Sequence, residues 1–425
     1  MRVLIPAEGT RGELQPCLAL AKALDEAGHE AVIAAFSRSN EYARDYGPYV
    51  IALGEHGPIT PMNDIGPKIT RGGVRGMLAR VELARVLRPA LLEVLDELWE
   101  VAAKGADLVL CLPGIMGGHH LAERLGVPGV AMMLAPLYVP RSDLPNPLLR
   151  RRVPGRLNRG TYVLSRGLAL PYQSTIDAWR ERTLGLPHRP GQRDPLRRPD
   201  GRPAPVLNAY SRHVVPAAPD AGPHVFTTGF WLPGVPERWR PPPDLDTFIA
   251  GGEPPVYVGF GSMHGHRPDQ AWHTVLTALR QLSVRAVVST GWGGLRPQGT
   301  EQDDVYVVGD VPHAWLFPRM AAVVHHGGAG TTATALAAGV PQVICPFFFD
   351  QPFWGERMHH LGVAPRPLPM RSLTAPALAD AIGRALTADR ARQAARLGEL
   401  VSAEDGTATA VAQLERLVQR GGSST

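Results

Sequence analysis

Short apolar runs alternate with longer amphipathic segments along the first 135 residues of the chain. Apolar runs of four to six residues are typical of strands that are buried on both faces, and segments with apolar residues three and four apart are typical of helices. This alternation predicts a parallel sheet covered by helices on both sides. The expected strands are 2–6, 29–35, 107–112 and 129–133, and the expected helices are 15–27 and 118–125.

The alternation loosens between about residues 136 and 243, where Pro, Gly and Arg are frequent, and then restarts. A strand-like run at 205–210 lies within this loose part, and Pro241–Pro243 is typical of a linker. The expected strands of the second half are 256–260, 285–289, 305–308, 321–325 and 342–345, and the expected helices are 269–282 and 330–338.

The pattern therefore predicts an α/β fold with two similar doubly wound domains. We place the N-terminal domain at 1–235, a linker at 236–252 and the C-terminal domain at 253–405, with a helix and tail at 406–425 that can pack back on the N-terminal domain. Ligands of such sheets bind beyond the carboxyl ends of the strands. The cleft between two facing domains is the expected active site.

The charge pattern narrows the possible functions. The net charge is +5, and 41 of the 44 basic residues are arginine, because Lys22, Lys68 and Lys104 are the only lysines. A pyridoxal lysine or a P-loop lysine is therefore excluded beyond residue 104. The arginine clusters at 150–152 and 197–198 lie in Pro-rich sequence, which favours solvated loops, with a small basic surface for membrane lipid or an acidic partner as the alternative. No pattern typical of nucleic-acid binding accompanies them.

The three cysteines, Cys17, Cys111 and Cys345, are widely spaced and match no metal-binding pattern, so a cytoplasmic protein with buried, reduced thiols is expected. The chain enters a strand-like run at once, so no signal peptide is expected. Residues 320–349 carry no charge, a length sufficient to span a membrane. Their glycines and prolines instead predict a buried strand–turn–helix–strand unit.

The glycine-rich run Val324–Thr332, at the start of the expected helix, is the strongest local motif. A helix N-terminus presents free N–H groups and a partial positive charge, which favour phosphate. The run has neither the Walker lysine nor the GxGxxG spacing. Phosphate binding with help from His326, Thr331 and Thr332 is one interpretation, and a tight turn with buried histidines is the other.

Two carboxylates follow other expected strands. Asp350-Gln351 comes after the strand at 342–345 and can hold a polyol by several hydrogen bonds, or Asp350 can cap a helix. Glu13 lies after the first strand and can act as a general base, but the local sequence taken alone favours an acidic residue that is stabilised by the helix dipole.

Three pairs are not expected to bind metal. Asp244-Leu-Asp246 opens an expected helix, and His119-His120 and His359-His360 lack further ligands at metal-site spacing. We interpret the first histidine pair as a candidate lining of the cleft and the second as helix surface.

Together, several motifs resemble a known family. Residues 312–318, 325–332 and 346–356 look like the donor-binding signature of two-domain, GT-B-fold glycosyltransferases of family 1, which glycosylate sterols, lipids and antibiotic aglycones. Within this family, the motifs of the sterol glucosyltransferase-like branch are the most similar to those of the chain. Further landmarks are residues 9–16, 179–186, 228–231 and 259–263, so the resemblance spans nearly the whole chain.

The resemblance implies two facing Rossmann-like domains with an interdomain cleft, and it implies roles for single residues. The position of Glu13 is an aspartate in the family that deprotonates the acceptor hydroxyl, so the carboxylate here reaches one methylene further. The third small residue of the phosphate cradle is Ala329, where the sterol branch often has serine. The donor-binding positions are Thr10, Arg11, Ser262, Trp292, Asp310, Val311, His313, His326, Gly328, Ala329, Gly330, Thr331, Asp350 and Gln351. Among these, the resemblance implies that Asp310, Val311 and His313 lie around the nucleobase and ribose, and that Asp350 and Gln351 hold the sugar hydroxyls.

The expected activity is an inverting, metal-independent transfer of a hexose from a UDP- or dTDP-sugar to a hydroxyl of a hydrophobic natural-product aglycone, lipid or sterol, with no cofactor. The expected partners are these small molecules and no nucleic acid, with peripheral membrane contact left open. The acceptor pocket is expected among residues 62–80, 113–120 and 136–145. A sugar-nucleotide epimerase of the same fold and a donor-binding homologue without activity are the alternatives.

Overall fold

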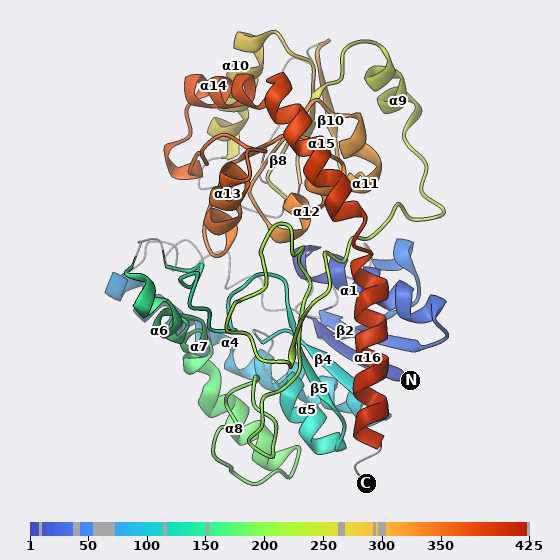
Figure 1. The fold of residues 1–425 in the computed structure, drawn as a ribbon, viewed down its shortest axis with the longest axis vertical. Helices are drawn as coiled ribbons and strands as arrows, with labels where there is room; N and C mark the ends of the chain where they lie inside the picture. Colours follow the sequence, from blue (N-terminus) through green and yellow to red (C-terminus); the bar gives the residue numbers. More distant parts are fainter. Residues whose placement is uncertain are drawn as a thin grey trace. The chain divides into compact units, whose positions relative to one another are not determined.

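The structure is a computed structural model, and it describes residues 1–7, 11–36, 43–53, 73–113, 117–149, 153–261, 268–291, 295 and 303–422. It divides into two compact units (Figure 1). Unit 1 comprises residues 1–212, 216–231 and 405–425, and unit 2 comprises residues 213–215 and 232–404.

Unit 1 is built on a seven-stranded sheet in the order β3-β2-β1-β4-β5-β6-β7, in which every neighbouring pair is parallel. Successive side chains of a strand point to opposite faces. Val3 and Ile5 therefore join the core on one face and Leu4 joins the core on the other. The strands are β1 (Arg2–Ala7), β2 (Glu30–Phe36), β3 (Val50–Leu53), β4 (Leu108–Cys111), β5 (Gly129–Met133), β6 (Val206–Asn208) and β7 (Val225–Thr227).

Helices cover both faces of this sheet. Helices α1 (Arg11–Glu26) and α16 (Gly406–Gly422) contribute to the core on one face. Helices α4 (Gly73–Ala102), α5 (Gly118–Leu125) and α8 (Gln173–Arg182) contribute to the core on the other. The last helix of the chain thus packs in unit 1, where Glu415 Oε1 lies 2.9 Å from His29 Nε2.

Unit 2 has a five-stranded parallel sheet in the order β10-β9-β8-β11-β12. Its strands are β8 (Val256–Gly259), β9 (Ala286–Ser289), β10 (Val305–Val308), β11 (Ala322–His325) and β12 (Gln342–Ile344). Its helices are α9 (Pro243–Ala250), α10 (Pro268–Leu282), α11 (His313–Leu316), α12 (Ala329–Ala337), α13 (Gln351–His360), α14 (Ala375–Ala385) and α15 (Ala388–Ser402). Helices α10 and α14 pack on one face, and α9, α11 and α12 pack on the other.

The predicted α/β class with two parallel sheets is confirmed. The apolar pattern did not predict β3, α4 or β7. Strands β3 and β7 are short and mostly half-buried, so they lack a long apolar run, and Pro89 within α4 is a residue that normally breaks a helix. Pro243, assigned to the linker, begins α9 instead, because proline is tolerated in the first turn of a helix.

The uncharged residues 320–349 form β11, a turn, α12 and β12, as predicted. Cys17, Cys111 and Cys345 are buried and free, also as predicted. Burial raises the pKa of Cys111 and of Cys345 to about 12, so these thiols stay protonated and unreactive. Within the described residues, no helix is both long and apolar enough to cross a membrane.

Candidate active site

The carboxyl ends of three neighbouring strands of unit 2 bring the candidate donor residues to one edge of the sheet. His325, the last residue of β11, pairs with Gly259 at the end of β8 on one side and with Ile344 at the end of β12 on the other. The segments that follow β11 and β12 therefore start side by side. This edge is where parallel sheets bind ligands.

His325 shapes the turn after β11 from inside the core. Its Nδ1 accepts a hydrogen bond from the Gly327 N–H at 3.1 Å, and its Nε2 lies 2.8 Å from Gln342 Oε1. Burial, with a smaller effect of His326, lowers the pKa of His325 to about 3, so the ring is neutral. For this histidine, the interpretation as a buried residue of a tight turn is correct.

Gly327 is required for that turn. Its φ of +86° lies in the left-handed region, which residues with a side chain rarely adopt. A Cβ at this position would also lie 2.7 Å from Ile344 Cγ2 and 3.1 Å from the Gln351 carbonyl oxygen. The turn therefore fixes the position of β12 and α13 as well as the start of α12.

Helix α12 starts without a side-chain cap. Its N-cap residue is Gly328, in an extended conformation and without a side-chain hydrogen bond, and Thr331 and Thr332 lie within the helix. The backbone N–H groups of Ala329, Gly330 and Thr331 precede the first intrahelical bonds of a nine-residue helix. Such groups are suited to an anion.

His326 is half-buried between two glycines at this helix start. A Cβ on Gly261 would lie 3.1 Å from His326 Cε1, and one on Gly328 would lie 2.5 Å from Nε2, so only glycines leave room for the ring. His326 Nδ1 is buried and has no hydrogen-bond partner among the described residues. Burial lowers the pKa of His326 to about 4, so the ring is neutral and offers one N–H donor.

Acid is expected to destabilise the protein through these two histidines. Their pKa values of about 3 and about 4 in the folded state are below the unfolded value of about 6.5, so only the unfolded state takes up protons as the pH falls from about 6.5 to about 4. The loss is about 1.4 kcal/mol per pH unit for each histidine, or about 2 kcal/mol for His326 at about pH 5. Urea unfolding should therefore show that His326→Asn loses about 2 kcal/mol less than wild type between about pH 7.5 and about pH 5. Equal losses in the two proteins would contradict this origin.

Asp350 carries a half-buried carboxylate at the end of the β12–α13 loop. It is the N-cap residue of α13, but its side chain makes no capping bond. Its Oδ2 instead accepts a hydrogen bond from Trp354 Nε1 at 2.9 Å, one turn further along α13. Burial raises the pKa of Asp350 to about 6. The i, i+4 spacing of Asp350 and Trp354 was a sequence signal for this pair that our sequence reasoning missed.

Gln351 holds the same loop. Its Oε1 accepts hydrogen bonds from the backbone N–H groups of Phe347, at 2.8 Å, and Phe348, at 3.2 Å. Phe349, which follows Phe348 in this loop, has a φ of +60°, which is rare for a bulky residue. The side-chain oxygen of Gln351 therefore holds the loop in place.

The three residues expected near the nucleobase differ in exposure. Asp310 is exposed, whereas Val311 is buried in the core under α11. His313 is half-buried, with Nε2 3.2 Å from Tyr257 Oη and its ring stacked on Phe317 at 4.4 Å between centroids. The structure thus places Asp310 and the His313 edge near the carboxyl end of β10, with Val311 supporting them from beneath.

Glu13 lies in unit 1, in the first turn of α1, directly after β1 and the short segment that follows it. The side chain is half-buried. Burial raises the pKa of the Cys17 thiol, and the negative charge of Glu13, one turn away, adds to this effect. Only the backbone of Arg11 is described, as the first residue of α1, and Thr10, Ser262 and Trp292 lie outside the described residues.

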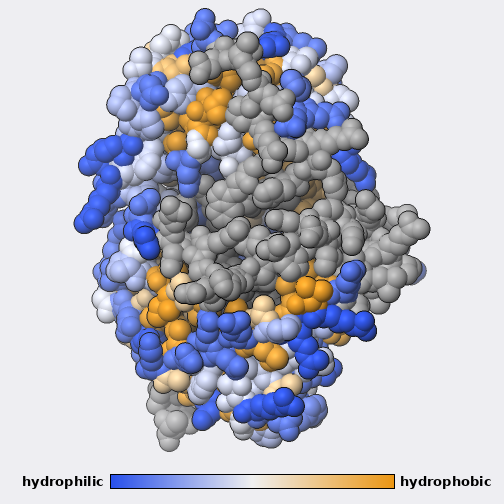
Figure 2. Space-filling view, turned by 180° about the vertical axis from the view of Figure 1, so that it is seen from behind, coloured by the Kyte–Doolittle hydropathy of each residue, from blue (hydrophilic) through white to orange (hydrophobic). Residues whose placement is uncertain are grey.

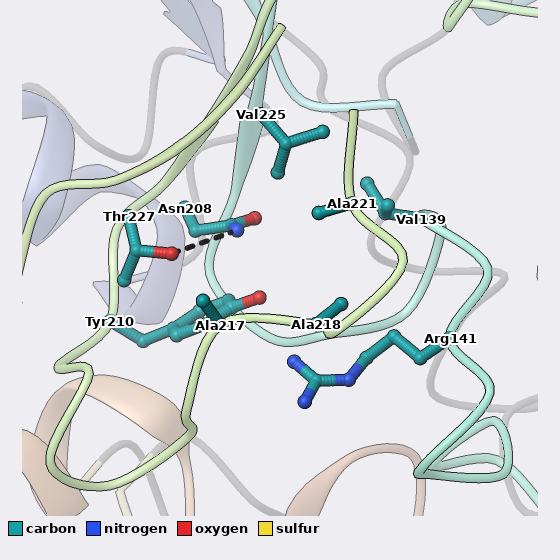
Figure 3. Close-up of a pocket in the computed structure, with 9 residues that line it drawn as sticks. All are labelled: Val139, Arg141, Asn208, Tyr210, Ala217, Ala218, Ala221, Val225 and Thr227. Atoms are coloured by element: carbon teal, nitrogen blue, oxygen red, sulfur yellow. Dashed lines mark hydrogen bonds between the residues drawn. The ribbon is translucent and has the colours of Figure 1, made fainter. Parts of the chain in front are cut away.

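A small cavity lies at the carboxyl ends of β6 and β7 in unit 1 (Figure 3). Asn208 Nδ2 donates to Thr227 Oγ1 at 3.3 Å, and Asn208 Oδ1 is buried with no hydrogen-bond partner among the described residues. Arg141 is held by Asp143. The cavity measures about 30 Å³, which is space for one or two water molecules and too little for an aglycone.

The other histidine and aspartate pairs have structural partners. His120 is buried, with Nδ1 2.9 Å from Arg180 Nη1, so it does not line a cleft as we had expected. Arg180 also binds Glu123; although burial raises the pKa of that carboxyl, hydrogen bonds from Arg180 and Arg189 lower it to about 2. Asp244 accepts a hydrogen bond from Tyr306 Oη at 2.6 Å. In the part of the chain that the structure describes, no group of three or more His, Cys, Asp and Glu residues is placed to hold a metal ion.

Comparisons with known proteins show the family to which the chain is related. Residues 3–141 match the family described as "Glycosyltransferase family 28 N-terminal domain", and residues 275–417 match "Erythromycin biosynthesis protein CIII-like, C-terminal domain". An O-mycaminosyltylonolide 6-deoxyallosyltransferase of Streptomyces fradiae is 34% identical and covers 98% of this chain, which spans 97% of that protein. A sterol 3-beta-glucosyltransferase of Arabidopsis thaliana is 33% identical over 97% of this chain, which spans 64% of that protein.

Solved structures of glycosyltransferases share the fold of this chain. The crystal structure of the glycosyltransferase VinC in complex with dTDP superposes with a TM-score of 0.67 at 20% sequence identity. The superposition covers 99% of this chain and 100% of the VinC chain. The likeness therefore extends over both units and nearly the whole chain. The chain belongs to the glycosyltransferases of the GT-B fold.

Proposed function

We propose that the protein transfers a hexose from a nucleotide-diphospho-sugar to a hydroxyl of a hydrophobic aglycone, lipid or sterol, with inversion at the anomeric carbon. The observation that carries this proposal is the turn after β11, where an uncapped helix start and a neutral His326 with an unpartnered nitrogen lie together. By their names, the relatives above act on a sterol and on O-mycaminosyltylonolide. The nucleotide is UDP or dTDP, and the dTDP complex of VinC favours dTDP.

The donor residues of unit 2 have separate tasks in this proposal. The backbone N–H groups at the start of α12 and the N–H of His326 bind the diphosphate, because they are the donors that lack protein partners. Asp350 accepts a hydrogen bond from a sugar hydroxyl, and the Gln351 amide nitrogen donates to one. Asp310 and His313 lie around the ribose and base.

The transfer step uses Glu13 as general base. The acceptor oxygen forms a bond to the anomeric carbon while the bond from that carbon to the diphosphate oxygen breaks, and the acceptor proton passes to the Glu13 carboxylate. The diphosphate leaves with its negative charge, which the α12 N-terminus and His326 stabilise. This chemistry needs no metal and no cofactor.

The test is a panel of UDP- and dTDP-sugars incubated with hydrophobic aglycones and analysed by mass spectrometry. A product heavier by one hexose, formed only when both donor and acceptor are present, is the expected result. An altered sugar with donor alone would identify an epimerase. Donor binding by calorimetry without any product would identify a donor-binding homologue.

The pH dependence of the reaction is expected to follow Asp350. Its pKa of about 6 means that the carboxylate becomes protonated as the pH falls through about 6, after which kcat/KM should drop about tenfold per pH unit. In Asp350→Asn the amide oxygen can still accept from Trp354 Nε1, so the fold is kept. This variant should be less active at neutral pH and show no inflection near pH 6. An unchanged inflection in the variant would assign it to another group.

A further inference from the structure

The residues after β5 contain a segment whose buried face is polar and whose exposed face is apolar. It consists of η3 (Gly155–Leu157), α6 (Asn158–Thr161), α7 (Val163–Gly167) and η4 (Leu170–Tyr172), and α6 and α7 lie beside each other in unit 1 (Figure 1). Globular proteins normally place the apolar side inward. The reversed arrangement therefore needs a physical reason.

Hydrogen bonds hold the inner face. Asn158 and Ser165 are buried. Asn158 Nδ2 donates to the Ser142 carbonyl at 2.8 Å, and Ser165 Oγ donates to the Leu137 carbonyl at 2.6 Å. Asn146, itself fully buried, donates to Ser165 Oγ at 2.7 Å. These polar contacts, together with the buried ring of Tyr162, whose Oη donates to the Leu144 carbonyl at 3.3 Å, fix the orientation of the segment.

The outer face presents large apolar side chains to solvent. We call Leu157, Val163, Leu164 and Leu170 the exposed apolar face; their exposed fractions are 51%, 66%, 42% and 66%. Hydrophobic residues reach the surface elsewhere too, as the patches in Figure 2 show, and single ones need no explanation. The described part of the chain has ten exposed large hydrophobic residues, and four of them lie within these fourteen residues. Such a concentration of exposed apolar side chains needs an explanation.

The sequence of this segment and of the residues directly before it is strongly basic. Residues 144–176 contain six arginines and no aspartate or glutamate. Arg159 and Arg166 form ion pairs with Asp220 and Asp194 from other segments, and residues 150–152 lie outside the described residues. Arg156, next to Leu157, is exposed.

We propose that the exposed apolar face docks on an anionic lipid bilayer. A bilayer surface offers negative headgroups above an apolar layer, which matches arginines beside exposed leucines and valines. A nucleic acid would match the arginines and leave the apolar side chains in water. The docking is independent of the proposed glycosyl transfer, since none of these residues belongs to the donor or base positions.

Flotation with lipid vesicles tests the docking. The full chain is mixed with phosphatidylcholine vesicles with or without phosphatidylglycerol, at low and at high salt. We expect binding to the anionic vesicles only, weakened by salt. Val163→Ser/Leu164→Ser should bind at least about tenfold more weakly, because two apolar side chains no longer enter the bilayer. Arg156→Glu should lose about fivefold per unit of charge changed.

The matched control is Arg396→Glu/Leu400→Ser, which changes one arginine and one 43%-exposed leucine on α15 of unit 2. It should bind vesicles within about twofold of wild type. Thermal melting of all variants should match wild type, because every changed side chain is exposed. Glycosyl transfer to a water-soluble acceptor should also be unchanged in Val163→Ser/Leu164→Ser, so this readout separates docking from activity.

Three results would overturn the proposal. One is a wild-type chain that does not float with anionic vesicles at low salt, and another is an equal loss of binding in the control. The third is a purified protein partner that binds wild type but not Val163→Ser/Leu164→Ser while vesicles bind neither. That last result would assign the exposed apolar face to a protein interface.

Discussion

Glu13→Gln is expected to lower the rate of glycosyl transfer by about 10²–10⁴-fold, the usual contribution of a general base. Glutamine keeps the size of the side chain and cannot accept the acceptor proton as a carboxylate does. The dissociation constant of the nucleotide donor should stay within about twofold, because Glu13 is not among the donor-binding positions. Stopped assays for the rate and calorimetry for the donor separate these two quantities.

Glu26→Gln is the matched control for this experiment. Glu26 ends the same helix and forms an exposed ion pair with Lys22, so its loss should change neither rate nor donor binding. Glu13→Asp restores the carboxylate of the resembled family with a shorter reach and should keep part of the activity. A Glu13→Gln enzyme with wild-type turnover would remove Glu13 from the mechanism.

Gly327→Ala is expected to cost about 2–5 kcal/mol of stability and to weaken donor binding at least about tenfold. About 1–2 kcal/mol comes from placing a Cβ at positive φ. The remainder comes from the contacts at 2.7 Å with Ile344 Cγ2 and 3.1 Å with the Gln351 carbonyl oxygen. Donor binding suffers because the displaced turn carries His326 and the start of α12. Chemical unfolding and calorimetry measure the two effects.

Gly362→Ala is the control that separates the backbone strain of a Cβ at positive φ from the close contacts that a Cβ makes at Gly327. Gly362 lies in the same unit with a φ of +78°, and a Cβ there would meet only Gln393 Cγ at an ordinary 3.4 Å. It should therefore lose about 1–2 kcal/mol and keep its donor affinity. If both variants lost the same stability and bound donor equally, the crowding at Gly327 would have no effect.

Much of the fold was predictable because buried parallel strands leave a continuous apolar signal. Strands β1, β8 and β11 and helices α5 and α12 appear within one or two residues of the expected ranges. The elements that were missed are those whose burial depends on neighbours. Strand β3 is half-exposed, and α4 contains a proline, so their own residues carry a weak or misleading signal.

The candidate site was predictable in residue types and only partly in roles. The sequence alone determined that no lysine after residue 104 can hold a phosphate, because lysine is absent from residue 105 onward. It also determined that a carboxylate follows the first strand and another follows the strand at 342–345. These statements rest on local sequence, where the order of strand, turn and helix is encoded.

Only the tertiary structure decided which of two adjacent histidines is held in the core by a partner. His325 is the last residue of β11 and points into the core, where Gln342 from the neighbouring strand binds it. His326 follows it, lies between Gly261 and Gly328, and keeps an unpartnered nitrogen. The two residues are identical in type, and successive side chains leave a strand on opposite sides. Their roles therefore depend on partners that are far away in the sequence, and no local pattern specifies those partners.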